Sequence, residues 1–335
     1  MFSLLRRLSS KLSVGSTEQD SLSLTGVRVS VEELIRLRFQ AGGIQLDSRR
    51  RAVHATAGPH ASRFRGRGID YQESRNYQAG DDIRHMDWRV TARTGRPHTK
   101  LYQEERERPI IVMVDLGPSM FFGTRRAFKS VVAAQAAALL GWATIQNGDR
   151  VGAFLFGHGD HYELRPSGGR RSVLQLIREL AVLTEPISER PTRGQPPLSE
   201  ALRCLRRVVR PGSVVFILSD FYSLDTDAEY HLTRLRQHND IIACQIIDAL
   251  ELAPPPPGYY AVTDGYDIRI LDTMSLALCN QYRAHFAAYE RRLQEVLRKR
   301  AMPLLRLLTH EDVAESLRRG LTNPLFGGVH NSILK

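Results

Sequence analysis

The chain has 335 residues, of which 42% are hydrophobic and 25% are charged. These shares are ordinary for a globular protein and exclude the fibrous, collagen-like and wholly disordered classes. The length suits about two domains. The formal net charge of +11 at pH 7 favours anionic partners. The arginines that produce it are spread along the whole chain, so the charge alone predicts no more than weak, non-specific binding of anions or nucleic acid.

Cysteine usage and the N-terminal segment indicate a cytoplasmic protein. The three cysteines, Cys204, Cys244 and Cys279, are far apart and form no CxxC pair, as expected of reduced thiols. Residues 1–29 are rich in serine and have few large apolar side chains after Leu12, which predicts a flexible leader. They lack the continuous apolar stretch and cleavage site of a signal peptide, and contact of this leader with a membrane surface stays open. The longest apolar stretch, 131–145, is shorter than a bilayer span of about 20 residues, so no transmembrane segment is expected.

A short helix and a polar segment are predicted over residues 30–109. Ser30 and Glu33 form the pattern of a capping box, which opens a helix that ends at Gly42-Gly43. From residue 59 to residue 100, glycine, arginine and aspartate dominate, and this stretch is too polar to form a core of its own. Positive and negative side chains alternate closely here, which favours an ordered, internally paired surface over a disordered tail.

An alternation of strands and helices begins after Pro109. Apolar runs predict strands buried on both faces at 110–114, 151–156, 214–218 and 241–247, with a shorter strand at 304–308. Apolar spacing predicts helices at 125–146, 172–183, 198–209, 231–237, 275–300 and 310–319. Less regular segments predict an antiparallel strand at 162–165 and a small hairpin over 261–271. The alternation is typical of an α/β fold with a mainly parallel sheet flanked by helices, spanning residues 110–320 and followed by a tail at 321–335.

Two acids follow predicted strands and mark a candidate site. Asp115 ends the first buried strand and precedes Ser119, and Asp220 ends the strand at 214–218. Sites in open parallel sheets form beyond the carboxyl ends of the strands, where two carboxylates and a hydroxyl could bind a hard cation. The alternative is structural: Asp115 caps the following loop and Asp220 begins a turn. On spacing alone both interpretations stay open.

The pairing of these two loops resembles the von Willebrand factor A domain and its metal-ion-dependent adhesion site. A longer upstream run, from RFRGRGIDYQESRNYQAGDDIRHMDW to VDLGPSM, resembles the bacterial family known as domain of unknown function 58. That family joins such a polar segment to a von Willebrand factor A-like domain. The resemblance covers about residues 45–320 and implies a Rossmann-like sheet, with the polar segment attached to its N-terminal side.

Compared with the adhesion-site motif, the loop after the first strand is incomplete. Asp115 and Ser119 match the first and last positions of the motif's Asp-x-Ser-x-Ser loop, and Asp220 matches the Asp of its third loop. Gly117 stands where the middle Ser is expected, and Pro196 where the motif has a Thr.

Thr192 lies four residues too early to replace that Thr. The resemblance therefore implies a degenerate metal site and no firm cofactor. Mg²⁺ or Mn²⁺ held by Asp115, Ser119, Asp220 and water is kept as the alternative.

The polar block around Asp87 contains the candidate partner-binding residues. Their side chains are guanidinium, carboxylate and indole groups, contributed by Arg84, Asp87, Trp88, Arg89 and Arg93. By spacing, no nucleophile stands beside a base, which argues against catalysis. One interpretation is a salt-bridged scaffold in which Trp88 packs against the α/β domain. The other is a recognition surface for a partner.

The resemblance also implies a function. Proteins of this family are typically encoded beside MoxR-type ATPases of the AAA+ class and are thought to act as their adaptors in assembling or maturing other proteins. We therefore expect a non-enzymatic interaction protein. Two alternatives from other classes remain: a nucleic-acid-binding protein that uses the basic surface, and a metal-dependent hydrolase.

Overall fold

A computed structural model describes residues 26–44, 46, 69–78, 83–104, 108–157, 161–185, 197–263 and 268–322. The predicted leader up to residue 25, the tail from residue 323, Thr192 and Pro196 lie outside these residues. The chain divides into two compact units, which are described separately. The larger lies within Met1–Arg49 and Arg108–Lys335, and the smaller within Arg50–Glu107.

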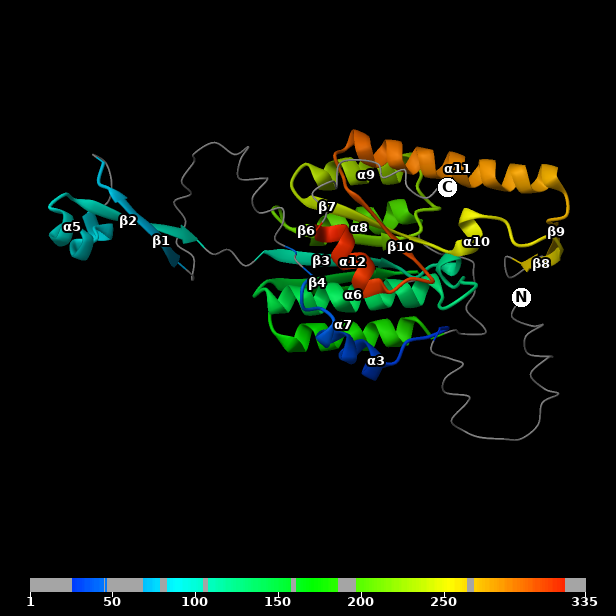
Figure 1. The fold of residues 1–335 in the computed structure, drawn as a ribbon, viewed down its shortest axis with the longest axis horizontal. Coiled ribbons are helices and arrows are strands. Elements are labelled where there is room, and N and C mark those ends of the chain that lie inside the picture. Colours follow the sequence, from blue (N-terminus) through cyan, green and yellow to red (C-terminus); the bar gives the residue numbers. More distant parts are fainter. Residues whose placement is uncertain are drawn as a thin grey trace. The chain divides into compact units, whose positions relative to one another are not determined.

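The larger unit is built on one six-stranded sheet (Figure 1). Its strands are β3 (Pro109–Asp115), β4 (Arg150–Phe156), β5 (His161–Ser167), β6 (Val214–Ser219), β7 (Asp240–Ile247) and β10 (Leu304–Leu308). They lie in the order β10-β7-β6-β3-β4-β5, and every neighbouring pair is parallel except β4 with β5. The predicted mainly parallel sheet is therefore confirmed.

The strand order fixes where a site can form. If the six strands are numbered along the chain, their spatial order is 3-2-1-4-5-6, the doubly wound arrangement. The chain moves outward from β3 to β5 and then returns to place β6 on the other side of β3. Ligands of such sheets bind where the order reverses, beyond the carboxyl ends of the two central strands. Here those strands are β3 and β6.

Helices cover both faces of this sheet (Figure 1). One face carries α3 (Val31–Arg36), α6 (Lys129–Gln146), α7 (Arg170–Leu183) and α12 (Val313–Thr322). The other carries α8 (Leu198–Val208), α9 (Thr226–Arg236) and α11 (Leu276–Lys299). This two-sided burial explains why the central strands are apolar at almost every position instead of alternating. Among the described residues, no helix has both the length and the apolar character needed to cross a membrane.

The central helix α6 begins later than the sequence predicts. The expected start was residue 125, but residues 121–128 form a loop in which Lys129 N donates to Phe122 O over 2.8 Å. Phe128, the residue before the helix, is extended. Lys129 is consequently the first residue of a helix that is buried along almost all of its alanine-rich length.

Two other helices differ from the prediction because of their caps. Helix α9 begins at Thr226, since Asp225 accepts from Ala228 N at 2.7 Å, well before the expected start at residue 231. Helix α12 begins at Val313 behind Asp312, which accepts from Glu315 N at 2.9 Å. Asp312 therefore caps this helix, whereas Thr309, the other expected cap, bonds elsewhere.

The N-terminal helix α3 belongs to the larger unit. Ser30 caps it as predicted, accepting from Glu33 N at 3.1 Å. Leu34 is fully buried in the core shared with α6, and Trp142 Nε1 donates to Leu34 O at 3.1 Å. We expected this helix to group with the polar segment over 30–109. The structure separates them because the burial of Leu34 ties α3 to the α/β core.

The smaller unit contains a hairpin and a helix. Strands β1 (Ile69–Asn76) and β2 (His98–Glu104) pair antiparallel, and η3 (Ile83–His85) and α5 (Trp88–Thr94) lie between them in sequence. Asp87 caps α5, and Gly95, with φ of 69°, ends it in the left-handed conformation that glycine adopts without strain.

Three short elements complete the larger unit. Strands β8 (Tyr259–Thr263) and β9 (Ile268–Asp272) form the predicted hairpin. Helix α10 (Ala249–Leu252), which was not predicted, follows β7 directly. Its capping box joins Asp248 and Glu251, and both acids belong to the candidate site.

Candidate functional site

The carboxyl ends of β3 and β6 bring the two predicted acids to one edge of the sheet. Asp115 is the last residue of β3, and Asp220 directly follows β6, its parallel neighbour. Ser219 Oγ donates to Asp115 Oδ2 at 2.6 Å and links the two strand ends. Both acids are buried, with 2% and 3% of their surface exposed.

Asp115 is held by the loop that follows it. Its Oδ1 accepts from Gly117 N at 2.9 Å, so the residue also caps this loop, as the structural interpretation predicted. Burial, together with the neighbouring Asp220 carboxylate, raises the pKa of Asp115 to about 7. Near neutral pH the side chain is therefore partly protonated.

Asp220 is held in a turn and by an ammonium group. Its Oδ1 accepts from Tyr222 N at 3.2 Å. Phe221 between them has φ of 58°, a left-handed conformation that is uncommon for a non-glycine residue. The other oxygen, Oδ2, accepts from Lys129 Nζ at 2.8 Å.

Lys129 completes the site, although no sequence pattern predicted its place there. Its Nζ donates to Asp220 Oδ2 and, at 2.7 Å, to Glu251 Oε1, while 1% of the residue is exposed. Burial by itself would lower the pKa of Lys129, but the charges of Asp220 and Glu251 outweigh it and raise this pKa above its ordinary value. The side chain is therefore a buried, permanently charged ammonium.

A third buried acid, Asp248, directly follows β7 and organises the adjoining loops. Thr124 donates to it through Oγ1 at 2.6 Å and N at 3.0 Å, Thr309 Oγ1 donates at 2.6 Å, and Leu250 N donates at 3.0 Å. Glu251 Oε2 accepts from Asp248 N at 2.8 Å. These bonds join the loop before α6, the helix α10 and the end of β10 to one carboxylate.

The residues at this edge do not fit a divalent cation as they are arranged. Asp220 Oδ2 accepts a hydrogen bond from the Lys129 ammonium and is therefore already paired with a cation. Ser119, the third predicted ligand, lies exposed in the short helix η4 (Pro118–Met120). Within the described part of the chain, no group of three or more His, Cys, Asp or Glu side chains is placed to hold a metal ion.

The smaller unit places the predicted partner-binding residues in two different environments. Asp87 is buried, and it accepts from Val90 N at 3.1 Å and from Ser74 Oγ at 2.7 Å. Its place is therefore structural: it caps α5 and ties that helix to β1. Trp88 is 66% exposed. The arginines of the set, Arg84, Arg89 and Arg93, are exposed as well.

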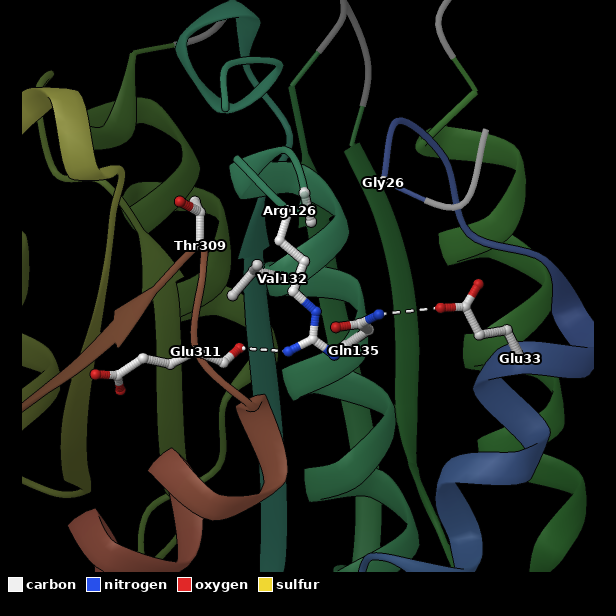
Figure 2. A pocket seen from close by; sticks show the side chains of 8 residues that line it. Gly26, Glu33, Arg126, Val132, Gln135, Thr309 and Glu311 are labelled. Atoms are coloured by element: carbon white, nitrogen blue, oxygen red, sulfur yellow. Dashed lines mark hydrogen bonds between the residues drawn. The ribbon is translucent and has the colours of Figure 1, made fainter. Parts of the chain in front are cut away.

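A separate small cavity lies between α3, α6 and the segment that joins β10 to α12 (Figure 2). Its volume is about 160 Å³, and charged and polar groups line it. Arg126 Nη1 donates to Glu311 O at 3.3 Å, and Gln135 Nε2 donates to Glu33 Oε1 at 3.1 Å. Because these polar groups hydrogen-bond to one another, they do not by themselves indicate a bound ligand in the cavity.

The strand order and the buried acids at the switch point define the class of this protein. It contains a doubly wound, Rossmann-like α/β domain, and a small hairpin unit precedes the first strand of the sheet in the sequence. The family model described as "Protein of unknown function DUF58" matches residues 73–296. The chain belongs to this family, as the sequence resemblance implied.

The chain is also similar to curated relatives and to solved structures. The chain is 29% identical over 256 residues to "Uncharacterized protein Rv1480" of Mycobacterium tuberculosis and to "Uncharacterized protein Mb1516" of Mycobacterium bovis, covering 76% of this chain and 79% of each relative. It is also similar to the conserved hypothetical protein BatB from Bacteroides thetaiotaomicron, with a TM-score of 0.38 and 13% identity over 64% of this chain and 97% of that one. The strand order by itself defines the doubly wound fold.

The raised pKa of Asp115 predicts how stability responds to pH. The folded state binds the Asp115 proton more tightly than the unfolded state, where a carboxyl titrates near 4. This contribution to stability is present below the unfolded pKa and is lost as pH rises through about 7. Asp115→Asn removes the titration while keeping an acceptor for Gly117 N.

We expect the free energy of unfolding of Asp115→Asn, relative to the wild type, to increase by about 2–3 kcal/mol between pH 5 and pH 8. Urea unfolding at both pH values measures it. A relative stability that is constant or falls over this range would contradict the assignment.

Proposed function

We propose that this protein is a non-enzymatic adaptor that binds a MoxR-type AAA+ ATPase through its smaller unit, in the assembly or maturation of client proteins. The observation that carries the proposal is the exposure of Trp88 at the start of α5, next to exposed arginines. Large exposed aromatic side chains and arginines are enriched at the centres of protein interfaces, whereas isolated surface positions are usually polar.

The chemistry at the edge of the sheet supports a binding role over catalysis. The acids there are buried, and the bonds of Asp115, Asp220 and Asp248 go to backbone amides, hydroxyls and an ammonium. Ser219, the hydroxyl that bonds to Asp115, is itself fully buried and out of reach of a substrate. A metal-dependent hydrolase would need exposed oxygen ligands and an activated water.

The choice of partner comes from family membership, because the resemblance associates this family with MoxR-type ATPases. Such a partner would place the protein in the cytoplasm. The basic character of the chain, with a net charge of +11, would favour an acidic docking surface on the ATPase.

The test is binding of the purified full-length protein to a purified MoxR-type ATPase from the same organism, with and without ATP. Trp88→Ala is expected to weaken binding at least about 30-fold, the size of a hot-spot loss. Its matched control is Tyr259→Ala, which removes an aromatic side chain of similar exposure, 71%, from the β8–β9 hairpin. Both variants should melt like the wild type, since both side chains lie at the surface.

Equal losses for the two variants, or no binding by the wild type, would contradict the proposal. Salt separates it from the nucleic-acid alternative. Phosphate contacts make log affinity fall with log salt by about 0.9 per neutralised phosphate on duplex DNA. Binding to duplex DNA that survives at physiological salt, together with no binding to the ATPase, would favour the alternative.

A further inference from the structure

We propose that Lys129 is a resident cation that takes the place of a divalent metal ion at the edge of the sheet, so that this site needs no metal ion. The juxtaposition behind this proposal is one buried ammonium between Asp220, at the end of β6, and Glu251, in α10. The proposal depends on the fold and the site, and not on the identity of the partner.

The ammonium is surrounded as a bound cation would be. Its Nζ lies 2.8 Å from Asp220 Oδ2 and 2.7 Å from Glu251 Oε1, and 5.1 Å from the centre of the Tyr222 ring. Two carboxylates and the face of an aromatic ring are all favourable for positive charge. Tyr222 in turn stacks on Tyr289, at 4.7 Å between ring centres, which closes the site on that side.

A metal ion could not bind beside this ammonium. The oxygens of Asp115 accept from Gly117 N and Ser219 Oγ, and those of Asp220 from Tyr222 N and Lys129 Nζ. A divalent ion at these oxygens would sit within a few ångströms of a buried positive charge, where repulsion is weakly screened. The ammonium and the metal ion are therefore mutually exclusive.

Two local preferences disfavour a lysine at position 129. It is the first residue of α6, and a cation is unfavourable at a helix N-terminus because of the helix dipole. A buried lysine also loses its hydration, which is costly without paired charges. A lysine at such a position is tolerated when tertiary contacts compensate for both costs. Here the carboxylates of Asp220 and Glu251 do so.

Removing the ammonium is expected to open the site to metal. Lys129→Ala would leave Asp220 and Glu251 facing an empty space, with Asp115 beside Asp220 across the strand ends. The carboxylates of Asp220 and Glu251, completed by water molecules, would suit Mn²⁺ or Mg²⁺ at the vacated position. Lys129→Met would remove the charge but keep the aliphatic stem, so the space would stay filled.

The experiment measures the melting temperature of the full-length protein in EDTA and over a titration with MnCl₂. The wild type and the surface control Lys299→Ala should not respond to Mn²⁺. Both Lys129 variants should melt lower than the wild type in EDTA. Mn²⁺ at a hundredfold excess over its Kd should raise the melting temperature of Lys129→Ala by about 5–10 °C, and that of Lys129→Met not at all. Adding Asp220→Asn to Lys129→Ala should abolish the rise.

A saturable rise for the wild type that is lost on Asp220→Asn would overturn the proposal, because metal would then bind despite the lysine. A folded Lys129→Ala that gains no response to Mn²⁺ would overturn it as well. If Lys129→Ala does not fold, direct titration of wild-type protein with Mn²⁺, followed by electron paramagnetic resonance, decides: specific binding overturns the proposal, and absence of binding supports it. None of these measurements involves a partner, so failure here is distinct from failure of the adaptor proposal.

Discussion

Asp248→Ala is expected to lower the free energy of unfolding by about 3–5 kcal/mol, among the largest effects of any single polar substitution. Asp248 is fully buried and accepts from the side chain and backbone of Thr124, from Thr309 and from the backbone of α10. Alanine would leave the buried Thr309 hydroxyl without an acceptor, which costs about 1–3 kcal/mol, and would also remove the hydrogen bonds of Thr124 and Leu250 N to a charged group. The loops after β3, β7 and β10 would lose their shared anchor together.

Urea unfolding of Asp248→Ala measures this loss, and Asp312→Ala is the matched control. Asp312 caps α12 by accepting from Glu315 N but is partly exposed, so its loss should cost only about 1 kcal/mol. Equal costs for the two variants would contradict the role of Asp248 as an anchor.

The same carboxylate predicts an acid-dependent loss of stability. Burial by itself would raise the pKa of Asp248, but the hydrogen bonds from Thr124 and Thr309 outweigh it and hold this pKa below its usual value. Its contribution is therefore present above the unfolded pKa and is lost as pH falls through the folded one. Asp115 acts in the opposite direction, and the two can be separated by comparing Asp248→Asn with Asp115→Asn across the pH range.

Gly157→Ala is expected to destabilise the fold by about 3 kcal/mol or more, through backbone strain at the edge that carries the site. A Cβ at Gly157 would lie 2.3 Å from Leu116 O and 2.5 Å from Leu116 C. Because these atoms belong to backbone, they can move only by shifting the loop after Asp115. That loop carries Gly117, whose N–H bonds to Asp115.

The comparison that isolates this strain is Gly168→Ala, near the start of α7. In the described part of the chain, no heavy atom beyond its immediate neighbours lies within 4 Å of a Cβ built there. Its effect should stay within about 0.5 kcal/mol, as for ordinary surface substitutions. Thermal melting of both variants is sufficient, and equal melting temperatures would show that the strand ends adjust without strain.

The sequence by itself determined the class of fold and the two acids at its centre. Apolar runs such as 110–114 and 214–218 predict strands buried on both faces, and their alternation with helices predicts a parallel sheet. Asp115 and Asp220 stand where those strands end, so the rule that sites form at strand ends was enough to select them. Gly117 and Pro196 stand at two motif positions where the resemblance implies oxygen ligands, which predicts an incomplete metal site.

Only the tertiary structure decided what neutralises those acids. Lys129 is separated from Asp220 by 91 residues and from Glu251 by 122, and in sequence it is one lysine at the start of an alanine-rich helix. The spacing of apolar residues predicts which face of a helix or strand is buried, but not which polar side chains come together from distant loops. The contact of Lys129 with these acids depends on where α6 begins. The loop over 121–128 sets that start, and no local sequence pattern predicts the conformation of this loop.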